Sequence, residues 1–181
     1  TPILKWDDMD TLQAVVRELR KAGAKTPECT SQHVHIGVRD FNARQIANFA
    51  RIFYKQEELL LKAAGTLQRR IDSYTRRTDR EFIARLEKAK PTTREELNKA
   101  WFGYSNPNPA HYDSMRYHAI NLNNVWRTGT VEVRAFNGTT HAGEVKSHIV
   151  LCLAIAALAK NAKCASTKNQ RPFCAESAKY D

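Results

Sequence analysis

The sequence predicts an α+β fold, with antiparallel strands packed against amphipathic helices. Two segments, 33–37 and 130–136, alternate apolar and polar residues with the period of two that is typical of strands. Three others, 10–22, 42–64 and 79–89, carry apolar residues at the spacing of one helix face. With 181 residues and 42% hydrophobic content, the chain can bury a substantial core as a single domain.

The elements can be placed in order along the chain. We expect Asp10 to cap the first helix, which ends at Gly23, before a connector leads to the first strand. Asn42 is expected to cap a long helix that runs to about Ala64 and ends at Gly65.

An Arg-rich segment, 67–90, contains the third helix, which Pro91 breaks. Thr93 then has the features of an N-cap for a fourth, short helix. The Asn- and Pro-rich residues 106–109 are typical of a loop.

Alternation returns at 117–123, where Asn121 and Asn123 share the polar side. Only a short Gly-containing turn at 127–129 separates this run from the strand 130–136. Two such strands joined by a short turn predict an antiparallel hairpin.

Residues 143–160 form the last predicted helix. Its apolar run, 149–159, is shorter than the roughly 20 residues that span a bilayer, so we expect a buried core helix and no membrane contact. Residues 1–160 are therefore predicted to form one domain, followed by a polar tail, 161–181, that is extended or mobile.

Both main strands carry reactive side chains on one face. In the first, Val34 and Ile36 point to the core while His33 and His35 point the other way. In the second, Glu132 and Arg134 lie together on the face opposite the core. We expect these four polar side chains to project into a solvent-filled cleft, as a site for a metal and an anion.

Each pair has a simpler explanation when it is taken alone. A His-x-His pair on a strand can be incidental, and Glu132 with Arg134 can be an ordinary salt bridge. Their occurrence together, each in a short apolar strand, favours a functional site. An arginine beside a metal-binding carboxylate is suited to phosphoryl transfer, which requires the phosphate charge to be neutralised.

Three segments together resemble a known family. They are 29–37 (CTSQHVHIG), 116–122 (RYHAINL) and 129–139 (GTVEVRAFNGT), and the resemblance covers about residues 1–160. In this order and spacing they look like the amidoligase family, which is related to glutamine synthetase and glutamate–cysteine ligase in the carboxylate–amine ligase superfamily.

The resemblance implies a glutamine-synthetase-like catalytic fold, a curved antiparallel sheet with helices packed on one face. It implies an enzyme that uses ATP and Mg²⁺ to form an amide or isopeptide bond through an acyl phosphate. The substrates would be a small-molecule or peptide carboxylate and an amine. Their identity, and the oligomeric state, are left open by the sequence.

The resemblance also implies roles for individual residues. His33 and Glu132 would bind the metal, His35 would lie near ATP or the second substrate, and Arg134 would contact the transferring phosphate. Glu132, Arg134 and His35 are thus the expected catalytic residues. Four others are expected to bind substrate or ATP: Arg116, Asn121, Arg70 and Tyr74.

One part of the family pattern does not occur in this sequence. Family members carry a strand with alternating glutamates that binds metal and ATP, and no such Glu-x-Glu strand precedes Thr1. We therefore expect the chain to be the C-terminal part of a longer ligase, with its N-terminal strands missing. By itself it would then bind metal poorly and be inactive.

Composition leaves a second class of function open. The chain has 29 Lys and Arg against 19 Asp and Glu, a formal charge of +10, which would suit nucleic-acid binding. No nucleic-acid-binding motif accompanies the charge, so we do not expect nucleic acid as a partner. A metal-dependent hydrolase that uses His33, His35 and Glu132 is a third possibility.

The cysteines indicate the compartment. They share no CxxC spacing, which argues against a structural zinc site and gives no disulfide framework. We therefore expect a reduced, cytoplasmic protein. The four residues are Cys29, Cys152, Cys164 and Cys174.

Overall fold

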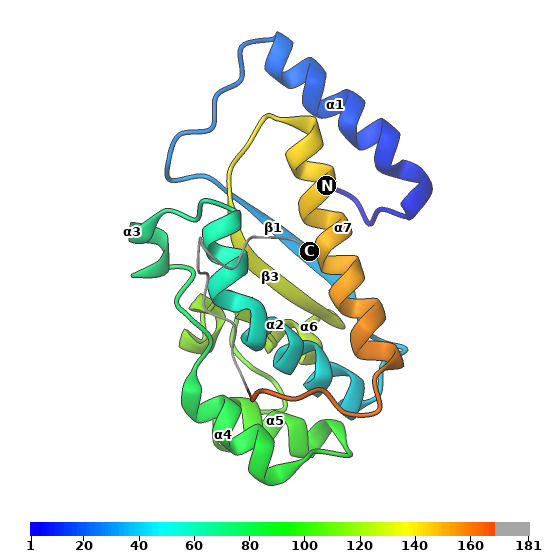
Figure 1. Ribbon diagram of the computed structural model, residues 1–181, viewed down its shortest axis with the longest axis vertical. Coiled ribbons are helices and arrows are strands. Elements are labelled where there is room, and N and C mark those ends of the chain that lie inside the picture. Colours follow the sequence, from blue (N-terminus) through cyan, green and yellow to red (C-terminus); the bar gives the residue numbers. More distant parts are fainter. Residues whose placement is uncertain (169–181) are drawn as a thin grey trace, which may run out of the picture.

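A three-stranded antiparallel sheet lies at the centre of the computed structural model, which describes residues 1–168 (Figure 1). Its strands are β1 (Ser31–Gly37), β2 (Ile120–Asn121) and β3 (Thr130–Asn137), in the order β1-β3-β2. Both pairs are antiparallel, so β3, the last strand in the sequence, occupies the middle of the sheet.

Helices make up most of the remaining structure. The α-helices are α1 (Met9–Lys21), α2 (Ala43–Ala63), α3 (Gln68–Ile71), α4 (Arg80–Ala89), α5 (Arg94–Phe102), α6 (Asn123–Arg127) and α7 (Ala142–Asn161). Two 3-10 turns, η1 (Trp6–Asp8) and η2 (Ser114–Tyr117), complete the elements. The predicted α+β class is confirmed, whereas the glutamine-synthetase-like architecture stays a prediction.

Side-chain caps begin the helices where the sequence predicts them. Asn42 accepts a hydrogen bond from the Gln45 backbone at 2.9 Å, and the Gln45 side chain returns one to the Asn42 backbone at 2.8 Å. Thr93 caps α5 in the same way. α1 is the exception, because it begins two residues earlier than predicted and Asp10 lies inside it.

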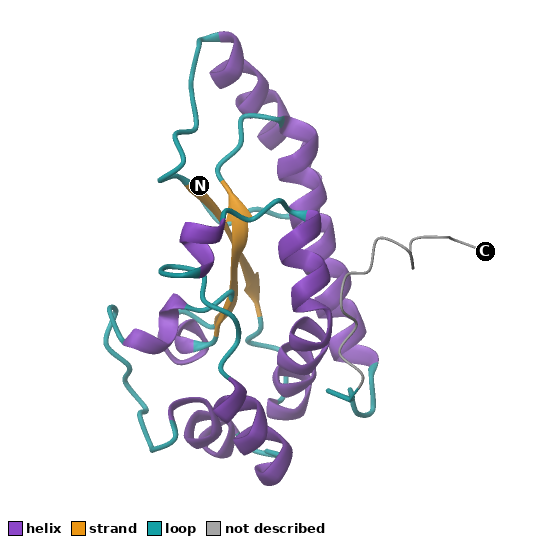
Figure 2. Ribbon diagram, turned by 60° about the vertical axis from the view of Figure 1, so that its left-hand side comes forward, coloured by secondary structure: helices purple, strands orange, loops and turns teal. Residues whose placement is uncertain are grey.

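The core lies on the face of the sheet that carries the valines. Val34 and Ile36 of β1 and Val131 and Val133 of β3 are all buried there. The two long helices α2 and α7 cover this face side by side (Figure 2). The opposite face is left for the polar side chains of both strands.

The predicted antiparallel pairing of the two segments is confirmed, but the first strand is shorter than predicted and the connection is longer. β2 consists only of Ile120–Asn121, and the helical turn α6 lies between it and the turn at 128–129 that precedes β3. The Asn121 side chain accepts a hydrogen bond from the Asn123 backbone at 2.9 Å. A local bond of this kind favours a turn over a longer strand.

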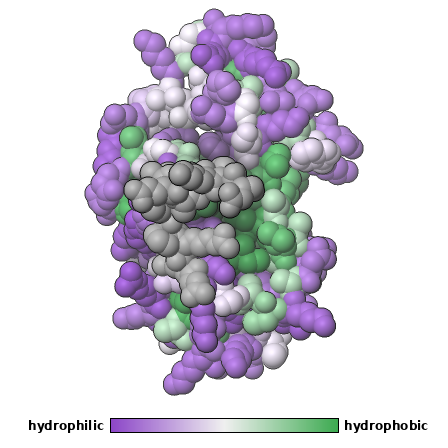
Figure 3. All heavy atoms as spheres, viewed as in Figure 1, coloured by the Kyte–Doolittle hydropathy of each residue, from purple (hydrophilic) through white to green (hydrophobic). Residues whose placement is uncertain are grey.

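The predicted burial of α7 is correct for only one of its faces. Cys152, Ile155 and Ala159 are buried, but on the other face Val150 and Leu158 are exposed. Figure 3 shows hydrophobic surface on the side of the molecule where α7 lies. α7 is long and apolar enough to cross a membrane by length and composition, a test that core helices of soluble proteins also pass.

The chain beyond α7 begins by returning to α2. The Asn48 side chain donates to the Ala162 carbonyl at 2.9 Å and accepts from the Ala165 backbone at 3.0 Å. Residues 169–181, most of the predicted tail, lie outside the described residues. The domain boundary at 160 stays a prediction.

Candidate active site

Strand pairing brings the two reactive segments together. His35 lies directly opposite Glu132 in the register of β1 and β3. Glu132 Oε1 is 3.0 Å from His33 Nδ1 and 2.7 Å from Arg134 Nη1. The expected convergence of His33, Glu132 and Arg134 is therefore confirmed, although about a hundred residues separate the strands.

Nitrogen donors from four elements, β1, β2, β3 and α6, surround the Glu132 carboxylate. His33 and Arg134 reach Oε1, and His35 Nε2 lies 3.6 Å from the same oxygen. Oε2 accepts hydrogen bonds from the amides of Asn121 at 2.7 Å and Asn124 at 3.1 Å, which come from β2 and α6. Neither oxygen is left without donors.

This environment fixes the charge of Glu132. Burial by itself would raise the pKa of the carboxyl, because a charge is poorly solvated away from water. The hydrogen bond from His33, the charge of Arg134 and the bond from Asn121 outweigh burial and hold the pKa at about 2. Glu132 is thus ionised at neutral pH.

The expected solvent-filled cleft is only half correct. The His33 and His35 side chains are partly open, at 29% and 43% exposure, whereas Glu132 and Arg134 are only 3% and 4% exposed as residues. Tyr74 contributes to this burial, since its carbonyl accepts a hydrogen bond from Arg134 Nε at 3.3 Å. The ion pair is a buried unit with two histidines at its rim.

His35 is held as a neutral base. Its Nδ1 lies 3.1 Å from the Thr130 hydroxyl. Burial lowers the pKa of His35; the charge of Glu132 opposes this, and the charges of His33 and Arg134 add to the lowering. A neutral imidazole at the rim can accept a proton from a substrate.

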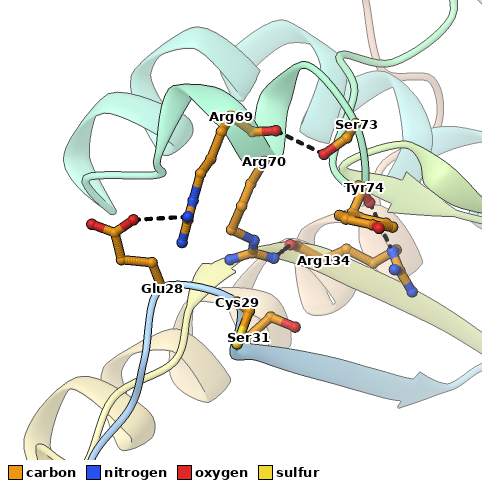
Figure 4. Close-up of a pocket in the computed structure, with 8 residues that line it drawn as sticks. All are labelled: Glu28, Cys29, Ser31, Arg69, Arg70, Ser73, Tyr74 and Arg134. Atoms are coloured by element: carbon orange, nitrogen blue, oxygen red, sulfur yellow. Dashed lines mark hydrogen bonds and ion pairs between the residues drawn. The ribbon is translucent and has the colours of Figure 1, made fainter.

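A cavity of about 360 Å³ lies beside the ion pair (Figure 4). Three arginines and one carboxylate line it, and that carboxylate, Glu28, is paired with Arg69 at 2.8 Å. The cavity is therefore suited to a small anionic ligand. Its lining residues are Glu28, Cys29, Ser31, Arg69, Arg70, Ser73, Tyr74 and Arg134.

The Arg70 guanidinium is hydrogen-bonded to backbone carbonyls of the protein. It is 5% exposed and donates to the carbonyls of Phe136 and Arg134, the latter at 3.0 Å, and to Thr75 Oγ1 at 3.2 Å. Burial lowers the pKa of Arg70, and the nearby charges of Arg134 and Arg69 lower it further. These contacts hold the cavity wall to β3, while the expected substrate role of Arg70 stays a prediction.

Arg116 is one of the predicted site residues that do not line the cavity. Its guanidinium donates to the His111 carbonyl at 2.9 Å and lies over the rings of Tyr112 and Tyr117. Tyr117 in turn makes an edge contact with Tyr74, which does line the cavity. Arg116 is thus connected to the site through aromatic rings.

The residues at this site do not fit Mg²⁺ as they are arranged. Both oxygens of Glu132 accept N–H donors, and His33 contacts Ser31 with one ring nitrogen and Glu132 with the other. Within residues 1–168, no group of three or more His, Cys, Asp or Glu side chains could hold a metal. Mg²⁺ demands oxygen ligands in near-octahedral geometry. The metal-ligand roles of His33 and Glu132 stay predictions.

A comparison with known protein families identifies the family of this chain. Residues 1–156 match the family model described as “Putative amidoligase enzyme”. The chain belongs to the amidoligase family. No curated protein and no solved structure matches it. Membership confirms the family resemblance and indicates a ligase enzyme that forms amide bonds.

Several residues of this amidoligase site were not found from the sequence, among them Arg69, Asn124 and Ser31. Asn124 was missed because a strand over 117–123 would end before it, whereas α6 turns its amide toward Glu132. Ser31 could have been found, since it shares the strand parity of His33 and lies two residues before it.

Proposed function

We propose that this amidoligase uses ATP to join a carboxylate to an amine through an acyl phosphate. The observation that carries the proposal is the arginine-lined cavity beside the Glu132–Arg134 pair, in a chain of this family. A volume of about 360 Å³ suits a small acid or the end of a peptide side chain. It lies near the lower limit of ordinary ligand pockets, which is about 300 Å³.

The proposed reaction has two steps. A carboxylate oxygen attacks the γ-phosphorus of ATP, the bond to the bridging oxygen breaks, and ADP leaves. The amine then attacks the carbonyl carbon of the acyl phosphate, loses a proton, and inorganic phosphate leaves. Both steps place negative charge on phosphate oxygens, which nearby guanidinium groups stabilise.

Individual residues have separate parts in this proposal. Arg134 and Arg69 would neutralise the phosphate and the substrate carboxylate, and Glu132 fixes the position of Arg134. His35 would accept the proton of the attacking amine because it is neutral and open at the rim. We include Mg²⁺ as the counter-ion of the ATP phosphates, with no role for it in either step. A cytoplasmic location would supply the ATP.

Oxygen transfer tests the acyl phosphate directly. The full-length enzyme is incubated with ATP, Mg²⁺, an ¹⁸O-labelled carboxylic acid and an amine, over panels of amino acids and short peptides. We expect ADP and amide to form together, with one ¹⁸O carried into the released phosphate. Amide formation without ADP, or ADP without oxygen transfer, would contradict the proposal.

Two arginines of the same basic segment provide a matched pair. Arg69→Ala should raise the KM for the acid or for ATP by about tenfold or more, since a hydrogen bond to a charged group contributes about 1.5–3 kcal/mol. Arg77→Ala should leave the KM unchanged, because Arg77 pairs with Glu58 and does not line the cavity. Equal effects would show that general charge, and not the cavity, binds the substrate.

The hydrolase alternative predicts a different dependence. A metal-dependent hydrolase would act on an amide without ATP and would stop when a chelator is added. The ligase would form no product without ATP. Assays with and without ATP, each with and without chelator, therefore distinguish the two reactions.

A further inference from the structure

Three side chains at the site, Ser31, His33 and Glu132, are linked by consecutive hydrogen bonds and form a hydrogen-bonded series. Ser31 Oγ lies 3.0 Å from His33 Nε2, and His33 Nδ1 lies 3.0 Å from Glu132 Oε1. A hydroxyl, an imidazole joined through both nitrogens, and a carboxylate are the three parts of an activated serine nucleophile.

Local structure explains how a short segment makes this arrangement. Ser31 and His33 are two residues apart on β1, so their side chains share the face opposite the core. The register between β1 and β3 shifts at Gln32 and Val34, on either side of His33. Glu132, on β3, lies within contact of the imidazole.

Ser31 and Glu132, the two ends of this hydrogen-bonded series, differ in solvent exposure, as catalysis by a serine nucleophile requires. Ser31 is exposed and lines the arginine-rich cavity, so its hydroxyl is accessible to a ligand. Glu132 is 3% exposed and is further held by Asn121 and Asn124. The carboxylate can therefore fix the orientation of His33, but it cannot itself reach a substrate in the cavity.

We propose that Ser31 is a catalytic nucleophile that hydrolyses activated esters of acids carrying a second negative charge. His33 is the general base, and Glu132 is a positioning residue that acts through His33. The His33–Glu132 pair, which does not fit a metal ion, thus activates the Ser31 hydroxyl instead. This activity needs neither ATP nor a metal, and it does not depend on the ligase reaction.

The proposed hydrolysis consists of two acyl transfers, first from the ester to Ser31 and then from Ser31 to water. Ser31 Oγ attacks the ester carbonyl carbon while its proton moves to His33 Nε2. The bond from carbon to the leaving-group oxygen breaks, and the leaving group takes that proton. Water then attacks the acyl-serine with His33 again accepting a proton, and Ser31 is released as the alcohol.

Neighbouring charges define the substrate class. Arg69 and Arg134 line the cavity that Ser31 also lines, which favours an acyl group with a distal carboxylate. Arg134 also shares Oε1 of Glu132 at 2.7 Å, so part of the carboxylate charge is already neutralised. Glu132 is then a weaker partner for His33, and only esters with good leaving groups should react.

The assay uses the full chain without ATP and with EDTA present. Hydrolysis of 4-nitrophenyl acetate is compared with that of mono-4-nitrophenyl succinate. We expect kcat/KM to be about tenfold higher for the succinate, the size of one hydrogen bond to a charged group. Equal kcat/KM values for the acetate and the succinate esters would overturn the proposed substrate class.

Matched serine variants test the nucleophile. Ser31→Ala should lower kcat/KM by about 100-fold or more, within the range of positioned general-base catalysis. Ser147→Ala removes an exposed serine that does not line the cavity and should have no effect. A fluorophosphonate probe should label Ser31 alone by mass spectrometry. Activity that persists in Ser31→Ala would indicate hydrolysis by a surface imidazole and would overturn the proposal. Labelling at Ser73 or Cys29 would also overturn it.

The positioning role of Glu132 has its own measurement. Glu132→Gln should lower kcat with little change in KM, and Glu132→Asp should restore part of kcat. If Glu132→Gln does not fold, Ser31→Ala still decides the outcome, because an exposed serine can be removed with an unchanged melting temperature. Equal kcat in Glu132→Gln and the wild type would exclude the three-residue series, and loss of activity in EDTA would indicate a metal-dependent hydrolase instead.

Discussion

At the scale of single residues, Glu132 determines the character of the site. It is a buried carboxylate whose charge is maintained by His33, Arg134 and two asparagine amides. The desolvation of such an ion is compensated only while all its partners are present. Glu132 therefore contributes to the stability of the fold as well as to the chemistry of the cavity.

We predict that Glu132→Ala destabilises the protein by about 3–5 kcal/mol, because it leaves the buried guanidinium of Arg134 without its partner. Glu18→Ala is the matched control, since Glu18 is 69% exposed and pairs only with Lys21. Its effect should stay within about 0.5 kcal/mol. Urea unfolding measures both. A loss below 1 kcal/mol for Glu132→Ala would show that the ion pair is not a buried unit.

The pH dependence of stability is the second prediction at this scale. The pKa of Glu132 is about 2 in the folded protein, against an ordinary value of 4.5 for a glutamate side chain. A lowered pKa stabilises the fold above the unfolded pKa, and this contribution is lost as the pH falls through the folded value. The difference in unfolding free energy between wild type and Glu132→Gln should therefore decrease between pH 4.5 and 2, by on the order of 3 kcal/mol. A difference that stays constant over this range would contradict the assignment.

At the scale of elements, alternation in β1 separates residues of packing from residues of chemistry. Val34 is 6% exposed and belongs to the core, whereas the His35 side chain is 43% exposed at the rim of the site. Neighbours in the same strand thus have opposite environments.

We predict that Val34→Asp unfolds the domain, because an unpaired charge in the core costs several kcal/mol. His35→Ala should leave it folded but slow in amide formation. Circular dichroism melts of the two variants give the comparison. Unfolding of His35→Ala to the same extent would mean that the imidazole is a structural group.

The sequence was sufficient wherever one local pattern defined an element. The caps at Asn42 and Thr93 and the alternation of β1 and β3 correctly predicted four elements and the faces of both strands. It was insufficient after Asn121, whose side chain accepts a hydrogen bond from the Asn123 backbone where the predicted strand ends early and α6 begins. Such a bond competes with alternation over a few residues, and periodicity alone cannot decide between them.

At the scale of the whole molecule, the site depends on contacts between distant segments. The sequence predicted that the histidines and the ion pair share a face, but it did not predict that Glu132 and Arg134 are buried. Their cover comes from Tyr74, Asn121 and Asn124, which lie in segments with no periodic relation to β3. Burial of polar residues is a tertiary property, and for that reason Arg134→Ala is expected to cost stability and not only activity.

The net charge of +10 provides the last prediction. Nucleic-acid affinity based on this charge alone should decrease by several orders of magnitude between 50 and about 200 mM salt, since counterion release dominates it. Amide formation should change much less, because the arginines that bind the substrate are partly enclosed. Fluorescence anisotropy with labelled DNA and the ADP assay measure the two at the same salt concentrations. Tight DNA binding at the higher salt would favour nucleic acid as the partner.

The central position of β3 has a consequence for the synthesis of the protein. β1 is made first, and in the described part of the chain its strand partner is β3, with a separation of 101 positions from His33 to Arg134. At about 5–20 residues per second, a ribosome needs roughly 5–20 s to make that interval. During this time β1 has no sheet to join, while α2, α4 and α5 can already form. Helices should therefore assemble first on the nascent chain, and the catalytic face should appear only when β3 is inserted.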